Sequence, residues 1–409
     1  MARIDPEKLA ALRVRIRTLT AVQQERLRTQ LEAQGIAWSE VCPEVDEVST
    51  LALVEQSRPA RLGLTPSQAH VWVLHQLFPN LCAYHIAFAW RLEGALDHAA
   101  LENALTQIVA RHESLRIVVR QEEGGEPYQT LLEPCAVKLD VVEASDTVVS
   151  QPFDLQMGPL YRMQWRREGE GVQVLVIVLH HLIADGWSRG VLMRDFAHYY
   201  RQHAGVESHS EMVRTDEALA QVGYSVFLGD QEWQQSREMA DQLDYWKRQL
   251  KGVTLLELPA DRPRPAQATF ESKTLIRALP LELADGMKQL ARSSGATLFM
   301  VLLAASKVLL HRHTGRSDLA VGVPVAGRRY PECADLIGFF VNTLVLRTQF
   351  SSSDCAAFTE WIQQVKATVL EGLEHQFVPF SEVVEACAPR RNSHQNPLNH
   401  LLLKFSFLE

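Results

Sequence analysis

Residues 172–188 read VQVLVIVLHHLIADGWS, and this stretch is the strongest guide to the fold. Residues 174–179 are an unbroken apolar run of strand length, which predicts a strand that is buried on both faces. The adjacent histidines His180 and His181 follow this run directly. We therefore expect both histidines at the corner where a core strand runs into a loop, a place where a rigid scaffold can present side chains to a cavity.

The residues after the histidines predict a turn and then a helix. Gly186 permits a sharp backbone turn. Ser188 is a preferred N-cap residue, and the apolar spacing that follows it predicts a helix that ends near Gly205. Ser188 is better explained as a cap than as a nucleophile, since no nucleophile-elbow motif surrounds it.

Neighbouring strand residues point to opposite faces, so His180 and His181 are not expected to enter the same pocket. At most one of the two histidines is therefore expected to take part in catalysis, and the other is expected to be structural. A zinc site is the first alternative, but two ligands on a strand need a common face, and no cysteine or third histidine lies close by in the sequence. We predict no metal. An incidental histidine pair that closes a core strand is the second alternative.

The string HHLIADGWS at residues 180–188 resembles the HHxxxDG core motif of condensation domains from nonribosomal peptide synthetases, which are related to chloramphenicol acetyltransferase. Other stretches resemble the family in its order along the chain. They are LTPSQAHVWVL at 64–74, RHESLR at 111–116, DYWKRQL at 244–250, LPADRPRP at 258–265, IGFFVNTLVLR at 337–347, HQFVPFSE at 375–382 and NPL at 396–398. The resemblance begins near residue 62 and reaches the last residue.

The resemblance implies an α/β (α+β) fold of two chloramphenicol-acetyltransferase-like lobes that form a V-shaped pseudo-dimer with a tunnel between them. Alternating helix and strand patterns place the first lobe at 61–250, and a second lobe at 251–409 follows a proline-rich linker. The family pattern continues further than residue 409, so the second lobe is expected to be truncated. Residues 1–60 predict a short helical leader, either a docking segment or a solvated spacer.

Composition limits the functional classes. The chain has 409 residues, of which 49 are acidic and 41 basic, and no basic stripe indicates a nucleic-acid partner. Its six cysteines are scattered without metal or disulfide spacing, which favours a cytoplasmic location. No signal-peptide pattern and no apolar run of membrane-spanning length occurs, so no membrane association is expected.

The resemblance assigns catalysis to the second histidine, His181, as a general base or as a positioning group for an attacking amine. His180, Asp185, Gly186 and Trp187 complete the supporting motif. In the family the aspartate is chiefly structural and pairs with an arginine, and the resemblance therefore argues against a catalytic dyad with His181.

The sequence does not identify the arginine that pairs with Asp185. The arginine that the family carries in its first motif is replaced here by His70, which leaves Arg111 and Arg116 as candidates. His112 between them is expected to be structural, with a bond to nearby backbone. We assign Arg111, His112 and Arg116 to a structural motif.

Asn342 lies in a mostly apolar stretch, where a buried amide needs hydrogen-bond partners. Its family position suggests a link across the lobe interface, which either shapes the tunnel or holds the core.

The function implied is amide bond formation between a donor acyl or peptidyl thioester and an acceptor aminoacyl thioester. Both substrates are carried on phosphopantetheine arms of donor and acceptor carrier proteins, and no intrinsic cofactor is expected. Residues 1–60 are a candidate contact with an upstream protein of the synthetase. The alternatives are a starter domain that acylates the first amino acid with a fatty acyl group, a related epimerase or cyclising domain, and a noncatalytic domain that recruits a partner protein.

Overall fold

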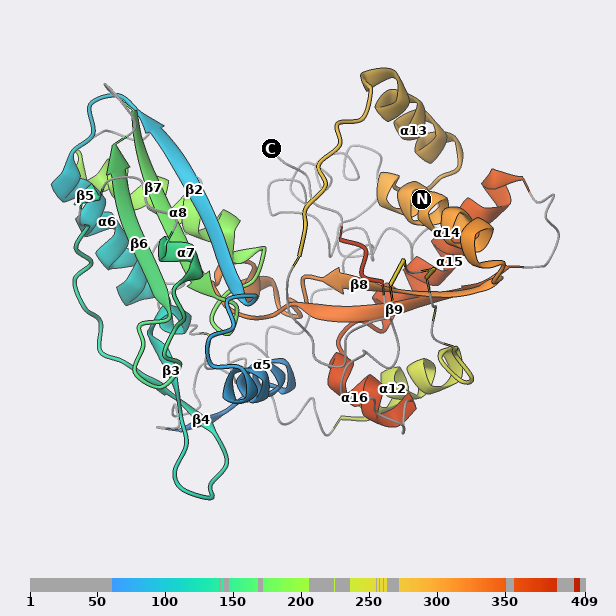
Figure 1. Ribbon diagram of the computed structural model, residues 1–409, viewed down its shortest axis with the longest axis horizontal. Helices are drawn as coiled ribbons and strands as arrows, with labels where there is room; N and C mark the ends of the chain where they lie inside the picture. Colours follow the sequence, from blue (N-terminus) through green and yellow to red (C-terminus); the bar gives the residue numbers. More distant parts are fainter. Residues whose placement is uncertain are drawn as a thin grey trace, which may run out of the picture. The chain divides into compact units, whose positions relative to one another are not determined.

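The chain forms two compact units (Figure 1). Each unit has its own hydrophobic core. We call the described part of Leu53–Ser236 and Ala326–Asn342 the first unit, and the described part of Arg237–Val325 and Thr343–Glu409 the second unit. The computed structural model describes residues 61–139, 141–142, 147–167, 172–205, 224, 236–254, 256, 258–259, 261–262, 272–350, 357–387 and 401–404.

A four-stranded sheet organises the first unit, in the order β2-β7-β6-β5. The three long strands are antiparallel, and β5 pairs parallel to β6. The register places His85 of β2 opposite His180 of β7. The strands are β2 (His85–Glu93), β5 (Val141–Val142), β6 (Tyr161–Arg167) and β7 (Val172–His180).

Strand β7 is buried along nearly its whole length, as its apolar run predicts. The helix that follows, α8 (Ser188–His203), packs against α6 (His98–Arg111), and the chain leaves it at Gly205 with a φ of +67°. The predicted helix is thus confirmed, but the predicted cap is wrong. The helix begins at Ser188, and the hydroxyl of Ser188 accepts the amide of Asp185 at 3.1 Å instead of capping the first turn.

A smaller sheet of order β1-β4-β3 and several short helices complete the first unit. The sequence pattern predicts a strand at 115–120, but the strand starts only at Ile117 because a 3-10 turn occupies the residues before it. These elements are β1 (Leu62–Gly63), α5 (Pro66–Leu77), η1 (Glu113–Arg116), β3 (Ile117–Arg120), β4 (Tyr128–Leu131), α7 (Thr147–Ser150) and η2 (Pro331–Asp335).

The second unit packs helices around the strand pair β8-β9, and Leu402 forms a parallel bridge to Gly322 of β8. The sequence pattern predicts helices at 280–292 and 298–311 and strands at 319–325 and 340–347. All four are present, and β9 starts two residues later than the predicted strand. The elements are α12 (Arg237–Gln249), α13 (Leu281–Ser293), α14 (Leu298–Thr314), β8 (Asp318–Val325), β9 (Asn342–Gln349), α15 (Phe358–Glu374) and α16 (Phe380–Cys387).

The division into units differs from a simple cut at residue 250. Helix α12 belongs to the second unit, and residues 326–342, which follow β8 and end with the first residue of β9, return to the first unit. The predicted leader at 1–60 and the NPL motif at 396–398 lie outside the described residues. The mixed helix-and-sheet class predicted from the sequence is confirmed.

Within the described residues, no single helix is long and apolar enough to cross a membrane. Helices α13 and α14 reach the length and hydropathy of a span only when they are taken together, and the chain bends by 105° between them.

Candidate active site

His180 is a buried end residue of β7. It is 3% exposed, and its Nδ1 accepts the amide N–H of Leu182 at 3.2 Å, which leaves the ring proton on Nε2. The rings of His85 and Phe153 lie edge-on at centroid distances of 6.0 Å and 5.9 Å. Burial lowers the pKa of His180 to about 3, and the neighbouring His85 contributes to this decrease. His180 is therefore a neutral packing residue around pH 7.

His181 has a different environment from its neighbour. Its backbone amide donates to the carbonyl of Tyr84 at 2.8 Å, which fixes the start of the loop. Its ring meets the ring of Phe339 at 4.7 Å and that of Tyr84 at 6.5 Å, both edge-on. The side chain is only partly buried. The two histidines thus differ in burial, and the assignment of catalysis to His181 stays a prediction.

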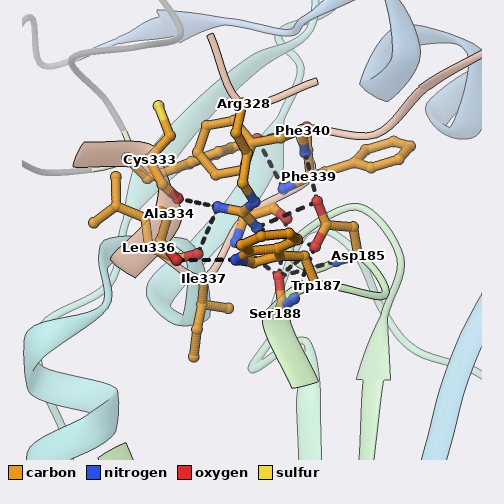
Figure 2. Close-up of polar contacts among 12 residues, drawn as sticks. Asp185, Trp187, Ser188, Arg328, Cys333, Ala334, Leu336, Ile337, Phe339 and Phe340 are labelled. Atoms are coloured by element: carbon orange, nitrogen blue, oxygen red, sulfur yellow. Dashed lines mark hydrogen bonds and ion pairs between the residues drawn. The ribbon is translucent and has the colours of Figure 1, made fainter. Parts of the chain in front are cut away.

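Asp185 is the centre of the loop that follows, and it pairs with Arg328 at 3.1 Å (Figure 2). Its Oδ1 also accepts the backbone amide of Ser188 at 2.9 Å and the hydroxyl of Ser188 at 2.8 Å. Its Oδ2 accepts the amide of Phe340 at 3.1 Å. The carboxylate is 2% exposed, so these bonds and the arginine compensate for its burial.

The predicted partners of Asp185 are therefore wrong. Arg111 pairs with Asp195 at 3.4 Å and donates to the hydroxyl of Tyr199 at 3.3 Å. Arg116 donates to the backbone carbonyl of Leu132 at 3.0 Å. Arg111 thus contacts helix α8 and Arg116 contacts backbone, and their predicted structural role stays a prediction.

Arg328 was not predicted as a partner, because it lies 143 residues from Asp185. It also donates to the carbonyls of Cys333 and Leu336, and its guanidinium lies 4.3 Å from the centre of the Phe340 ring. Burial lowers the pKa of Arg328, while Asp185 raises it. The only sequence feature that marks Arg328 is its position in VPVAGRR, directly after a predicted apolar strand. Such a position indicates that the chain leaves a sheet there, but it does not identify a partner.

We call residues 181–188 the histidine loop. Residues 326–342 make several hydrogen bonds with this loop (Figure 2). The indole N–H of Trp187 donates to the carbonyl of Ala334 at 2.9 Å. The hydroxyl of Ser188 lies 3.2 Å from the amide nitrogen and 3.1 Å from the carbonyl of Gly338. The hydroxyl of Tyr224 lies 3.3 Å from both the amide nitrogen and the carbonyl oxygen of Phe339.

Two glycines make this close approach possible. Gly327 has a φ of +64°, and a Cβ there would lie 1.9 Å from the carbonyl oxygen of Phe340. A Cβ on Gly338 would lie 2.4 Å from the ring of Tyr224. Neither position tolerates a side chain without movement of its surroundings. Gly186 lies exposed in the turn between Asp185 and Trp187. The sequence also predicts that its missing side chain lets a substrate approach the backbone closely, and this stays a prediction.

His112 is buried and bonds to distant backbone. Its Nε2 lies 2.9 Å from Asp195, and its Nδ1 accepts the amide of Ile337 at 3.4 Å. The prediction of a bond to nearby backbone is wrong, because the bond is made to Ile337, which lies 225 positions away in the sequence. Asn342 is the first residue of β9 and is partly buried. Its predicted role in a tunnel or interface stays a prediction.

Metal ligands do not gather in the part of the chain that the structure describes. No group of three or more histidine, cysteine, aspartate or glutamate side chains there is arranged to hold a metal ion.

Comparison with known proteins identifies the family. Residues 60–408 match the family model of the condensation domain. Over 361 residues, which are 84% of this chain, it is 38% identical to chondramide synthase cmdD of Chondromyces crocatus. Over 362 residues, or 86% of the chain, it is 34% identical to tyrocidine synthase 2 of Brevibacillus parabrevis. The chain spans only 9% and 10% of the lengths of these two relatives.

Solved structures show the same fold. The X-domain from teicoplanin biosynthesis matches with a TM-score of 0.71 and 28% identity, over 86% of this chain and 78% of that one. The complex of this X-domain with OxyB matches with a TM-score of 0.72 and 27% identity over the same shares. The first condensation domain of the calcium-dependent antibiotic synthetase, solved with a substrate analogue, matches in fold with a TM-score of 0.65 and 24% identity, over 81% of this chain and 78% of that one.

The sequence motifs, the loop built around Asp185 and Arg328, and the family match over residues 60–408 agree with one another. The chain belongs to the condensation domain family of nonribosomal peptide synthetases.

Proposed function

We propose that this domain joins a donor acyl or peptidyl thioester to an acceptor aminoacyl thioester and so forms an amide bond. The observation that carries the proposal is the contrast between the two histidines. His180 is buried, neutral and bonded to backbone. His181 follows it directly at the end of β7, and its side chain is only partly buried. An intact histidine motif on a condensation fold supports a catalytic domain.

The chemistry that His181 would perform follows from the reaction. The nitrogen of the acceptor amine attacks the thioester carbonyl, a C–N bond forms, and the C–S bond breaks. The amine loses a proton, and the sulfur of the donor arm leaves as a thiol. Because an α-amino group has a pKa of roughly 8, part of it is protonated near neutrality. A neutral imidazole accepts the proton as attack proceeds, or it orients the amine and stabilises the tetrahedral species.

Asp185 supports this chemistry indirectly. Both of its carboxylate oxygens are engaged by Arg328, Ser188 and Phe340, and this argues for a structural role rather than a dyad with His181. We propose that it holds the histidine loop and residues 326–342 in one arrangement.

The proposed substrates define the partners. Donor and acceptor carrier proteins would present the thioesters on phosphopantetheine arms, and the domain itself would need no bound cofactor. A cytoplasmic location and a contact between residues 1–60 and an upstream protein of the synthetase remain predictions. The donor group is either aminoacyl or fatty acyl, and the test below includes both kinds of donor.

A second candidate is a noncatalytic domain that recruits a partner protein. It is favoured by the likeness to the X-domain from teicoplanin biosynthesis, which has been solved in complex with OxyB. The two candidates differ in one observable, because only the first makes an amide.

The test loads a donor carrier with an aminoacyl or fatty acyl group and an acceptor carrier with an amino acid. The acceptor carrier is then followed by intact mass. We expect the acceptor to gain the mass of the donor group with the wild-type protein and with His313→Ala, an exposed histidine in α14. We expect no gain with His181→Ala. Equal product from His181→Ala would remove His181 from the mechanism, and no product from the wild type with any donor would favour recruitment.

A further inference from the structure

We propose that His112 is a positioning residue of the active site, which fixes Phe339 against the ring of His181 through the backbone amide of Ile337. The inference rests on the proposed function of His181. It goes further because it assigns the buried histidine of the RHESLR stretch a part in the geometry of catalysis.

The tautomer of His112 follows from its two contacts. Its side chain is 1% exposed, and the ring lies between the carboxylate of Asp195 at 2.9 Å and the amide of Ile337 at 3.4 Å. A neutral imidazole has one donor and one acceptor nitrogen. Because an amide N–H can only donate, Nδ1 accepts from Ile337 and Nε2–H donates to Asp195. Both ring nitrogens are thereby used.

Asp195 holds the ring from the other side. It comes from α8, is 1% exposed and also lies 3.0 Å from Arg194 and 3.4 Å from Arg111. Arg194 in turn contacts Asp335, which lies two residues before Ile337. The ring of His112 is therefore clamped between helix α8 and residues 335–337, and it has little freedom to move.

The contact reaches His181 through two further residues. Ile337 is 1% exposed, Gly338 follows it against the hydroxyl of Ser188, and Phe339 then places its ring 4.7 Å from that of His181. Three successive residues are thus anchored at their backbone by His112, Ser188 and Tyr224. Catalytic groups are sensitive to small displacements, and an error of about 1 Å can cost about a hundredfold in rate.

Two substitutions separate the contacts of the ring. His112→Asn keeps an acceptor atom near the position of Nδ1 and loses the reach to Asp195. His112→Gln keeps a donor near the position of Nε2 and loses the bond to Ile337. Each leaves a small space. His112→Gln also leaves the buried amide of Ile337 without its acceptor, whereas in His112→Asn the carboxylate of Asp195 keeps Arg194 and Arg111. We expect both to lower stability, and thermal unfolding measures the loss for each. A role in stability alone predicts similar activity for both folded variants.

The experiment compares the wild type and both variants in the carrier-to-carrier assay, with thermal unfolding as the measure of folding. For His112→Gln we expect kcat to fall by at least about tenfold while KM for the acceptor carrier changes less than about twofold, because orientation and not binding is lost. For His112→Asn we expect kcat within about threefold of the wild type. Equal activity of the two folded variants would overturn the proposal.

A spectroscopic measurement keeps this test separate from that of the proposed function. Histidine ring signals are recorded by NMR on ring-labelled full-length protein, and His181→Ala identifies the signal of His181. We expect this signal to shift in His112→Gln, because the Phe339 ring moves, and to stay near its wild-type position in His112→Asn. If the wild type makes no amide, the proposed function fails, but the shift still decides the positioning role. An unmoved His181 signal in His112→Gln would overturn it.

Discussion

Both units of the molecule bury cations, and Arg328 of the first unit and Lys307 of the second unit are satisfied in different ways. In the first unit the side chain of Arg328 is 5% exposed and pairs with Asp185. In the second unit Lys307 of α14 is fully buried and donates to neutral acceptors. These are the carbonyl of Leu346 at 2.8 Å, the hydroxyl of Thr348 at 2.6 Å and the carbonyl of Leu319 at 3.4 Å.

The difference follows from the chemistry of the two groups. A guanidinium cannot lose its proton in a protein, so its burial requires a counter-charge. An amine can become neutral instead. Burial lowers the pKa of Lys307 to about 7, and Asp318 raises it only in part. Arg328 therefore has a permanent ionic role beside the histidine loop, whereas Lys307 is a titratable support between α14 and the β8-β9 pair.

The largest effect is expected from Asp185→Asn. The substitution keeps the size of the side chain but leaves the buried Arg328 without its counter-charge, and such losses cost about 3–5 kcal/mol. The free energy of unfolding from urea titration measures it. The control is Asp285→Asn in α13, which removes an exposed pair with Lys288 at 3.1 Å and should change stability by less than about 0.5 kcal/mol. Similar losses for both variants would contradict the account.

Lys307 predicts a pH dependence with a definite sign. The pKa in the folded state is about 7, below the ordinary value of 10.5, so between these pH values the unfolded chain binds the additional proton. Stability should then rise with pH by about 1.4 kcal/mol per unit above pH 7 and level off below it. The measured quantity is the difference in unfolding free energy between the wild type and Lys307→Met from pH 6 to about 9. A difference that is constant over this range would show that the amine does not titrate near neutrality.

A smaller effect is expected where residues 326–342 approach the histidine loop. Gly338→Ala places a methyl group 2.4 Å from the ring of Tyr224, and overpacking of this kind costs about 1–3 kcal/mol. We also expect amide formation to slow, because Phe339 follows Gly338. Gly190→Ala in α8 meets nothing within 4 Å, and it should raise the thermal midpoint slightly. If the Gly338→Ala protein is as stable and as active as the Gly190→Ala control, the close packing of Gly338 against Tyr224 is refuted.

The smallest effect tests the neutral acceptors of Lys307. Thr348→Val keeps the shape of the side chain and removes the hydroxyl at 2.6 Å from the amine. The loss of one hydrogen bond of this kind should lower stability by about 1–2 kcal/mol when the amine is charged, and by less at high pH. Urea titrations at pH 6 and pH 9 measure this change. An equal loss at both pH values would contradict a charged amine at pH 6.

The sequence predicted the elements whose pattern is local. The apolar run of β7 and the helical spacing of α8 can each be recognised within a short stretch of sequence. The proline-rich linker at 258–265 does not mark the division, because it lies inside the second unit. Strand β2 was not predicted, although it is the partner that places His85 opposite His180. Its exposure alternates only partly along the strand, so its pattern is weaker than that of the buried β7.

The sequence predicted the central residues of the candidate site, but it did not predict the distant residues that contact them. The motif named His181 and Asp185, because both lie within one loop. Arg328 contacts Asp185 and Phe339 contacts His181, and both contacts depend on how the chain returns after β8. Spacing in the sequence carries no information about such distant contacts. The substitution of the family arginine by His70 showed that the usual partner was missing, but it could not identify its replacement.

The most direct test of the central claim is the single-turnover rate of transfer between two loaded carriers. Wild-type protein and His181→Ala are compared at equal concentration after thermal unfolding has shown that both are folded. A general base typically contributes about a hundredfold to ten-thousandfold, and we predict a fall of at least about a hundredfold for His181→Ala. A rate within about threefold of the wild type would contradict a catalytic role for His181.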